Sequence, residues 1–99
     1  MDMQTPVIVE AVRTPFGKRG GKFRDTHSQD LAAAPLNELE DRLGFEPTEV
    51  DDVIYGCVTN VGEQGWDAGR TAALSAGWGA DVPGIQLNRQ CGSSQEAIS

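Results

Sequence analysis

Short runs of apolar and β-branched residues alternate with helical patterns along this chain of 99 residues. Three such runs, at residues 6–12, 52–59 and 85–87, have the length and composition of buried strands. Helical patterns at residues 28–43 and 68–76 separate them, and a further helix begins after the last run. This alternation predicts an α/β fold, a sheet of three mostly parallel strands with right-handed crossovers.

The longer helical pattern carries its own start and stop signals and one conflict. Ser28 can cap the first turn, and Gly44 can end the helix. Pro35 lies in the middle and removes one backbone hydrogen bond at a cost of about 3 kcal/mol, so we expect a kink or a helix that begins later. The stripe expected to be buried consists of leucines at helical spacing, Leu31, Leu36, Leu39 and Leu43.

The charge balance excludes several classes of partner. With a formal net charge of −7, the chain is too acidic to bind nucleic acid or an anionic membrane surface. Its basic residues are nevertheless clustered, because five of the eight lie in a glycine-rich loop between Arg13 and Arg24. That loop either contacts an anionic ligand or a partner subunit, or is a solvated surface loop. No apolar run could cross a bilayer and no secretory leader is visible, so we expect a cytoplasmic protein.

The two cysteines, Cys57 and Cys91, are far apart in the sequence. They form no C-x-x-C pair, and the single histidine, His27, is not at ligand spacing, so we expect no metal site. Two cysteines are also few for a disulfide scaffold, which favours reduced thiols. Cys57 lies within a predicted strand, and we interpret it as a small core residue.

Cys91 is the candidate nucleophile. It stands at a predicted strand-to-helix turn, where the first N–H groups of a helix lack internal partners and the helix dipole favours negative charge. Both effects favour a thiolate over a thiol, and the same N–H groups can hold a developing oxyanion. Parallel sheets bind ligands beyond the carboxyl ends of their strands, where Cys91 is expected together with the loops at residues 13–27 and 60–67.

Four stretches of the sequence together resemble the N-terminal part of the thiolases, the acyl-CoA acetyltransferases. They occur in the family's order and are VIVEAVRTPFGK at residues 7–18, VIYGCVT at 53–59, GEQ with AGR at 62–70, and NRQCGS at 88–93. Two positions depart from the family's common pattern, since Ser94 stands where glycine is usual and Gln95 where leucine is usual. The stretch QCGS with Gln95 close behind it resembles the corresponding stretch of thiolases that act on steroid side chains.

The resemblance implies part of a thiolase-like, doubly wound α/β sheet and an acyltransferase of fatty acid and lipid metabolism. Cys91 matches the family's nucleophile, which forms an acyl-thioester and whose backbone N–H helps to form the oxyanion hole. The thioester then acylates acetyl-CoA by Claisen condensation, or the cycle runs in reverse and CoA splits a 3-ketoacyl-CoA. Gln64 and Arg70 match a region near the substrate site and the subunit contact. Acyl-CoA and CoA are the expected partners, with no other cofactor, in a homodimer or homotetramer.

The family's histidine base, second cysteine and CoA-binding loop match nothing in these 99 residues. Residues 1–99 are therefore expected to be an incomplete portion of a thiolase N-terminal domain, inactive in isolation. An alternative is a non-catalytic, truncated thiolase-like assembly or interaction protein. A third possibility is a redox or acyl-carrying module that uses Cys91 alone.

Overall fold

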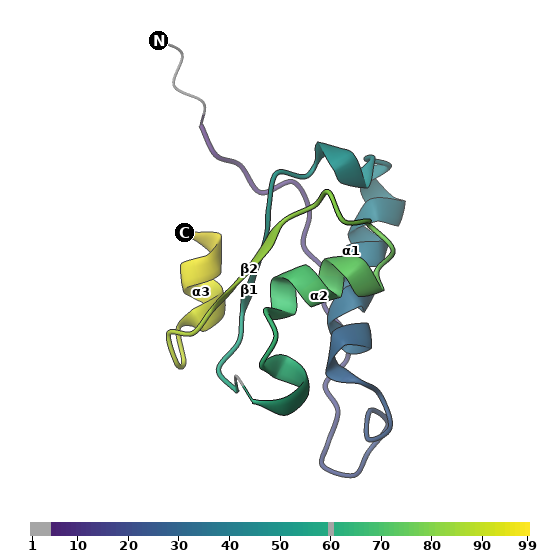
Figure 1. The fold of residues 1–99 in the computed structure, drawn as a ribbon, viewed down its shortest axis with the longest axis vertical. Coiled ribbons are helices and arrows are strands. Elements are labelled where there is room, and N and C mark those ends of the chain that lie inside the picture. Colours follow the sequence, from purple (N-terminus) through teal and green to yellow (C-terminus); the bar gives the residue numbers. More distant parts are fainter. Residues whose placement is uncertain (1–4, 60) are drawn as a thin grey trace.

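The structure is a computed structural model, and it describes residues 5–59 and 61–99 (Figure 1). Helices and strands alternate along the chain, which confirms the predicted α/β class. Single 3₁₀ turns, η1 and η2, follow α1 and β1. In chain order the elements are α1 (Ser28–Leu43), η1 (Pro47–Glu49), β1 (Val53–Gly56), η2 (Gly62–Gln64), α2 (Ala68–Ser75), β2 (Gly84–Leu87) and α3 (Ser93–Ile98).

The sheet of the described residues contains two strands, β1 and β2, in parallel. Val53 pairs with Gly84 and Gly56 with Leu87, so the two carboxyl ends lie side by side. The prediction of a third strand at residues 6–12 is wrong for this structure, where that segment has no assigned secondary structure. Its side chains remain outside, with Ile8 80% exposed, and β-branched residues stabilise a strand only when it finds a partner and a covered face.

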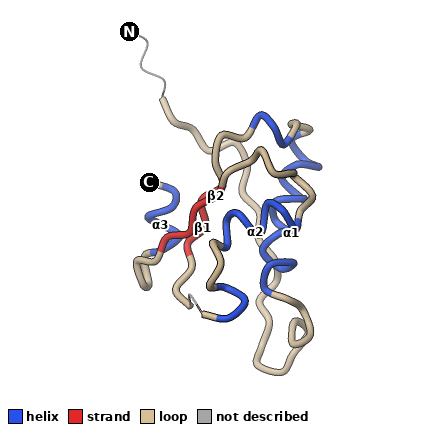
Figure 2. Tube along the Cα trace, viewed as in Figure 1, coloured by secondary structure: helices blue, strands red, loops and turns tan. Residues whose placement is uncertain are grey.

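The helices cover the two faces of the sheet (Figures 1 and 2). α2 packs on one face, α1 packs on α2, and α3 packs on β1 from the other face. Gly69 permits the close approach of α2, because a Cβ there would lie 2.6 Å from the carbonyl oxygens of Val53 and Ile85. The site-bearing helix α3 therefore stands alone on its face of the sheet.

The observed start of α1 differs from the predicted one. His27, not Ser28, is the N-cap, and its Nδ1 accepts a hydrogen bond from the Gln29 N–H at 3.1 Å. Gly44 ends the helix as predicted, in the left-handed conformation with φ 67°. The helix runs through Pro35 over 16 residues, so the expectation of a later start is wrong. The packing of α1 on α2 offsets the one backbone bond that proline removes.

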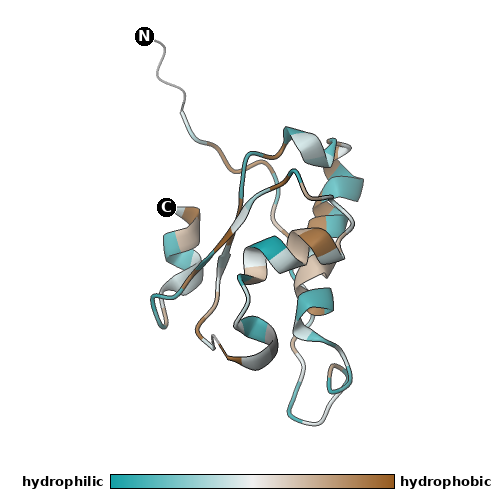
Figure 3. Cartoon of the chain, in the orientation of Figure 1, coloured by the Kyte–Doolittle hydropathy of each residue, from teal (hydrophilic) through white to brown (hydrophobic). Residues whose placement is uncertain are grey.

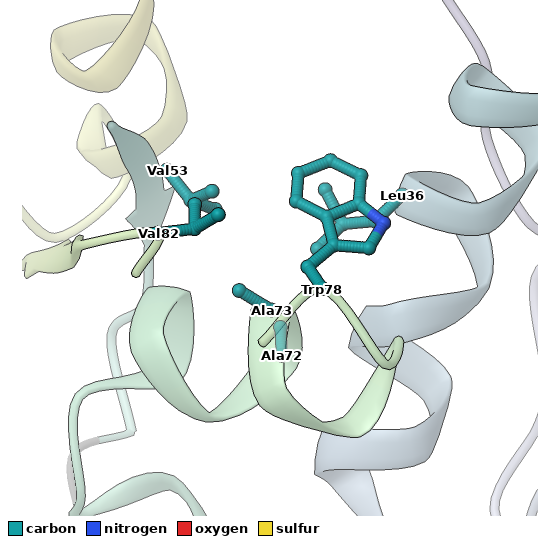
Figure 4. Packing of buried hydrophobic residues seen from close by; sticks show 6 residues of the cluster. All are labelled: Leu36, Val53, Ala72, Ala73, Trp78 and Val82. Atoms are coloured by element: carbon teal, nitrogen blue, oxygen red, sulfur yellow. The ribbon is translucent and has the colours of Figure 1, made fainter. Parts of the chain in front are cut away.

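A small core joins α1, α2 and the sheet (Figure 4). Trp78 is its largest member, and its ring packs edge-on against Phe45 with centroids 5.5 Å apart. The Trp78 indole N–H donates to Glu40 Oε1 at 2.9 Å, so the buried polar atom of the ring has a partner. The buried cluster consists of Leu36, Val53, Ala72, Ala73, Trp78 and Val82.

Several large hydrophobic side chains are exposed, and Figure 3 shows hydrophobic residues along the N-terminal segment. Val7 and Val9 are 75% and 71% exposed. The accessible surface is 7474 Å², whereas a compact monomer of this mass exposes about 5,500 Å². Leu36 alone of the predicted leucine stripe is fully buried, and Leu43 is 42% exposed.

Among the described residues, the helices are too short or too polar to span a bilayer.

Candidate functional site

Cys91 lies in the turn that joins β2 to α3, at the carboxyl edge of the sheet, as the sequence predicted. Its side chain is exposed and its thiol is free. Gly92, the next residue, is the N-cap of α3. The Cys91 N–H donates to no backbone carbonyl within residues 5–59 and 61–99. The turn thus presents an accessible sulfur, and its backbone forms an isolated parallel β-bridge between Arg89 and Cys91.

Ser93 holds this turn together. Its Oγ accepts a hydrogen bond from the Arg89 N–H at 2.7 Å and donates one to the Gln90 carbonyl at 2.8 Å. Ser93 is only 5% exposed, so these bonds are made out of solvent. They bracket Cys91 and hold Gln90 in the left-handed region at φ 48°, a conformation that non-glycine residues rarely adopt. Sequence reasoning assigned no such role to Ser93.

Gly56 lets α3 start directly against the end of β1. A Cβ at this position would lie 2.5 Å from the carbonyl carbon of Ser93 and even closer to the Ser94 nitrogen. These atoms belong to the backbone and cannot rotate away. A glycine inside a strand is typical of a place where another backbone approaches closely, as α3 does here.

Asn88 ties the two strand exits to each other. Its side-chain amide donates to the Val58 carbonyl at 3.3 Å, and its Oδ1 accepts from the Gln90 N–H at 3.0 Å. The loop after β1 and the turn that carries Cys91 therefore share one bridging side chain. This amide is a second positioning group that sequence reasoning missed, although it opens the NRQCGS stretch.

Gln64 lies at the same edge but on the α1–α2 face of the sheet. Its Oε1 accepts a hydrogen bond from Cys57 Sγ at 3.1 Å, and its backbone carbonyl accepts one from Gln86 Nε2 at 3.1 Å. Cys57 is half-buried and lies outside the buried cluster, so its interpretation as a core residue is not confirmed. Both side chains line a cavity of about 260 Å³, which Cys91 does not line.

Tyr55 lines the same cavity, and the fold changes the pKa of its phenol. Burial raises its pKa from 10.0 to about 12. The hydroxyl donates a hydrogen bond to the Ala32 carbonyl of α1. The neutral phenol therefore fastens β1 to α1.

Arg70 is placed away from Cys91. Its guanidinium Nη1 donates to the Val82 carbonyl at 2.6 Å, on the segment that leads into the amino end of β2. Its backbone N–H bonds to Asp67 Oδ1, the cap of α2, at 3.2 Å. The structure therefore brings Gln64 and Cys91 to the same sheet edge but holds Arg70 toward the opposite end.

The described residues supply no general base to the Cys91 thiol. The chain's one histidine, His27, caps α1. Arg89, two residues before the cysteine, forms an exposed ion pair with Glu96 at 3.3 Å. Within the described part of the chain, no group of three or more His, Cys, Asp or Glu residues could hold a metal ion. The site thus holds an exposed thiol in a turn that Ser93 braces.

Comparison with known proteins assigns the family. A family model for the N-terminal domain of thiolases matches residues 6–99. A steroid 3-ketoacyl-CoA thiolase of Mycobacterium tuberculosis is 46% identical over 97 residues, which are 98% of this chain and 24% of that protein. A 3-ketoacyl-CoA thiolase of Pseudoalteromonas translucida is 43% identical, covering 97% of this chain and 25% of that protein. A β-ketoadipyl-CoA thiolase of Acinetobacter baylyi is also 43% identical, with 98% and 24% covered. The chain spans about a quarter of the length of these relatives.

Proposed function

Because this chain belongs to the thiolase family, we propose that Cys91 is the nucleophile that accepts an acyl group from acyl-CoA. The observation that supports the role is an exposed thiol in a turn braced on both sides by the buried hydroxyl of Ser93. A nucleophile held in one place avoids the entropy loss of ordering a mobile loop during the reaction.

The proposed first half-reaction is a thioester exchange. The Cys91 thiolate attacks the carbonyl carbon of the acyl-CoA, and the C–S bond to CoA breaks after a tetrahedral intermediate. The Cys91 N–H, which has no backbone acceptor, donates to the oxyanion of that intermediate. The thiol proton leaves with CoA, and the acyl group stays on Cys91 as a thioester. No cofactor beyond the CoA thioester is required.

In the second half-reaction the acyl group leaves Cys91 for a carbon or a sulfur nucleophile. Transfer to the α-carbon of acetyl-CoA forms a 3-ketoacyl-CoA, and transfer to CoA completes thiolysis in the reverse direction. Condensation needs a base that removes the α-carbon proton of acetyl-CoA, and in the reverse direction the same carbon must be protonated when Cys91 attacks a 3-ketoacyl-CoA and acetyl-CoA leaves; such proton transfers typically contribute factors of about 10²–10⁴. Since the described residues hold no such group at Cys91, we propose that residues 1–99 alone do not turn over.

A chimera separates the nucleophile's role from the missing proton-transfer groups. In it, this segment replaces the matching 97 residues of the Mycobacterium tuberculosis relative. We expect thiolytic activity from the chimera, and loss of that activity with Cys91→Ala. Cys57→Ala is the matched control, since that thiol bonds to Gln64 on the other face of the sheet. Activity that survives Cys91→Ala would refute the assignment.

A second candidate function is assembly without catalysis. It is favoured by the exposure of the apolar N-terminal segment, where Val7, Ile8 and Val9 are all more than 70% exposed. On this alternative the chimera would fold but show no thiolysis, whichever residue stands at position 91.

A further inference from the structure

The peptide unit between Gln90 and Cys91 lies at the centre of a tight turn. The turn is closed by a hydrogen bond from the Gly92 N–H to the Arg89 carbonyl at 3.0 Å, which uses only the outer peptide units. Turn types with the same closing bond differ in the direction of the central unit, because ψ of the first central residue and φ of the second change together by roughly 150–170°. The closing bond alone therefore does not fix where the Cys91 N–H points.

Ser93 fixes that direction, because both of its donors meet the carbonyl of the central unit. Ser93 Oγ donates to the Gln90 carbonyl oxygen at 2.8 Å, and the Ser93 N–H donates to the same oxygen at 3.2 Å. A peptide unit is planar and trans, so its C=O and its N–H point in opposite directions. A Gln90 carbonyl held on Ser93 thus leaves the Cys91 N–H directed away from it.

The backbone of Gln90 needs this support. Its φ of 48° lies in the left-handed region, which contacts of the Cβ atom disfavour for residues other than glycine. The Gln90 N–H is held by Asn88 Oδ1 at 3.0 Å, whereas its carbonyl is held by Ser93. Without the Ser93 hydroxyl, only the 3.2 Å backbone bond would keep the central peptide unit in its present direction.

The hydroxyl is also one link in a chain of hydrogen bonds that runs in a single direction. The Arg89 N–H donates to Ser93 Oγ at 2.7 Å, and the hydroxyl proton is then donated to the Gln90 carbonyl. Each bond in such a chain strengthens the next by about 10–30%. A carbonyl that accepts a stronger bond draws electrons through the amide, which makes the N–H of the same peptide unit, here that of Cys91, a better donor.

We propose that Ser93 is a positioning residue for acyl transfer, because its hydroxyl directs and polarises the Cys91 N–H toward the oxyanion. The inference rests on the proposed function, in which this N–H donates to the tetrahedral intermediate. As the Cys91 sulfur adds to the acyl carbonyl, the electron pair of the C=O bond moves to the oxygen, and it returns when CoA leaves. Ser93 keeps its own proton throughout and acts most strongly while the oxygen is charged.

Two reactions of the same sulfur separate this role from that of holding the thiol in place. Acetylation of Cys91 by acetyl-CoA passes through an oxyanion, whereas alkylation by iodoacetamide displaces iodide from a saturated carbon and forms none. Both rates are measured in the chimera by mass spectrometry of the Cys91 peptide. The pH is set on the plateau of the alkylation rate, so that the thiol is ionised to the same extent in each variant.

We expect Ser93→Ala to slow acetylation about tenfold and alkylation less than about twofold. The effect is smaller than the factor of about 10²–10³ for the loss of an oxyanion donor, because the Cys91 N–H and the 3.2 Å bond to Gln90 both remain. Ser94→Ala is the matched control, since this neighbouring serine is exposed, and both of its rates should be unchanged.

Ser93→Thr tests the hydroxyl itself, because a helical threonine can also bond to the carbonyl three residues before it. We expect this variant to recover most of the acetylation rate that alanine loses. Equal slowing of acetylation and alkylation by Ser93→Ala, or unchanged acetylation, would overturn the proposal. Threonine that acetylates as slowly as alanine while alkylation stays normal would also overturn it. A chimera that is never acetylated on Cys91 would refute the proposed function, and this inference with it.

Discussion

Gly56→Ala is the substitution that most directly probes how the Cys91 turn is positioned. The added Cβ would stand 2.5 Å from the Ser93 carbonyl carbon, 0.9 Å short of the 3.4 Å at which ordinary contact begins. The start of α3 must therefore retreat from β1 by a comparable distance. Overpacking of this kind costs about 1–3 kcal/mol, partly offset by about 0.5–1 kcal/mol because glycine is unfavourable in a strand.

The expected net loss is about 0.5–2 kcal/mol in the free energy of unfolding. With an m-value of about 1–3 kcal/mol/M, the urea midpoint should fall by roughly 0.2–2 M. Hydrogen exchange supplies a local readout, because the α3 amides should exchange faster once the helix no longer rests on β1.

Gly92→Ala is the matched control on the other side of Cys91. A Cβ at Gly92 would lie 3.6 Å from the Arg89 carbonyl oxygen, which is ordinary contact, and the residue's φ is −104°. Because alanine is a poorer N-cap than glycine, we expect Gly92→Ala to lower the free energy of unfolding by about 0.5 kcal/mol, less than Gly56→Ala does. Equal losses for the two alanines, or none for Gly56→Ala, would refute the close-approach argument.

Two further stability predictions follow from named contacts. The folded state raises the pKa of Tyr55 from 10.0 to about 12, so its contribution is complete below pH 10 and is lost as the pH rises toward 12. In pH-dependent urea unfolding, Tyr55→Phe should lack this part of the alkaline loss, and identical alkaline profiles would count against the buried phenol. Arg70→Met should cost about 1–2 kcal/mol, because it leaves the Val82 carbonyl without its 2.6 Å partner. Arg89→Met, which removes only an exposed ion pair, should cost under about 0.5 kcal/mol. A lower melting temperature for Arg89→Met than for Arg70→Met would contradict the proposed importance of the Arg70–Val82 hydrogen bond.

Local patterns predicted the elements that have a partner in this structure. The apolar runs at residues 52–59 and 85–87 became β1 and β2, and both long helical patterns formed. The run at residues 6–12 has equal β-propensity but no assigned strand, because pairing depends on which edge is available and not on composition. A local sequence pattern does not show which strand of the sheet a segment will pair with.

The sequence predicted that Cys91 lies in a strand-to-helix turn, but it did not predict the hydrogen bonds that hold this turn. A short apolar run followed by small residues located the turn at the sheet edge. The bonds that hold it come from Ser93 and Asn88, whose contacts depend on the fold of the turn itself. The cap of α1 was missed for a similar reason, since His27 and Ser28 can both accept a hydrogen bond and only backbone geometry decides between them.

The central claim is that Cys91 carries the acyl group, and the most direct measurement is the site of acylation. The chimera is mixed with acetyl-CoA, quenched in acid and digested, and its peptides are analysed by mass spectrometry. The account predicts one acetyl group on the peptide that contains Cys91, released by added CoA. Acetylation of the Cys57 peptide in its place, or no acetyl-enzyme while turnover proceeds, would contradict it.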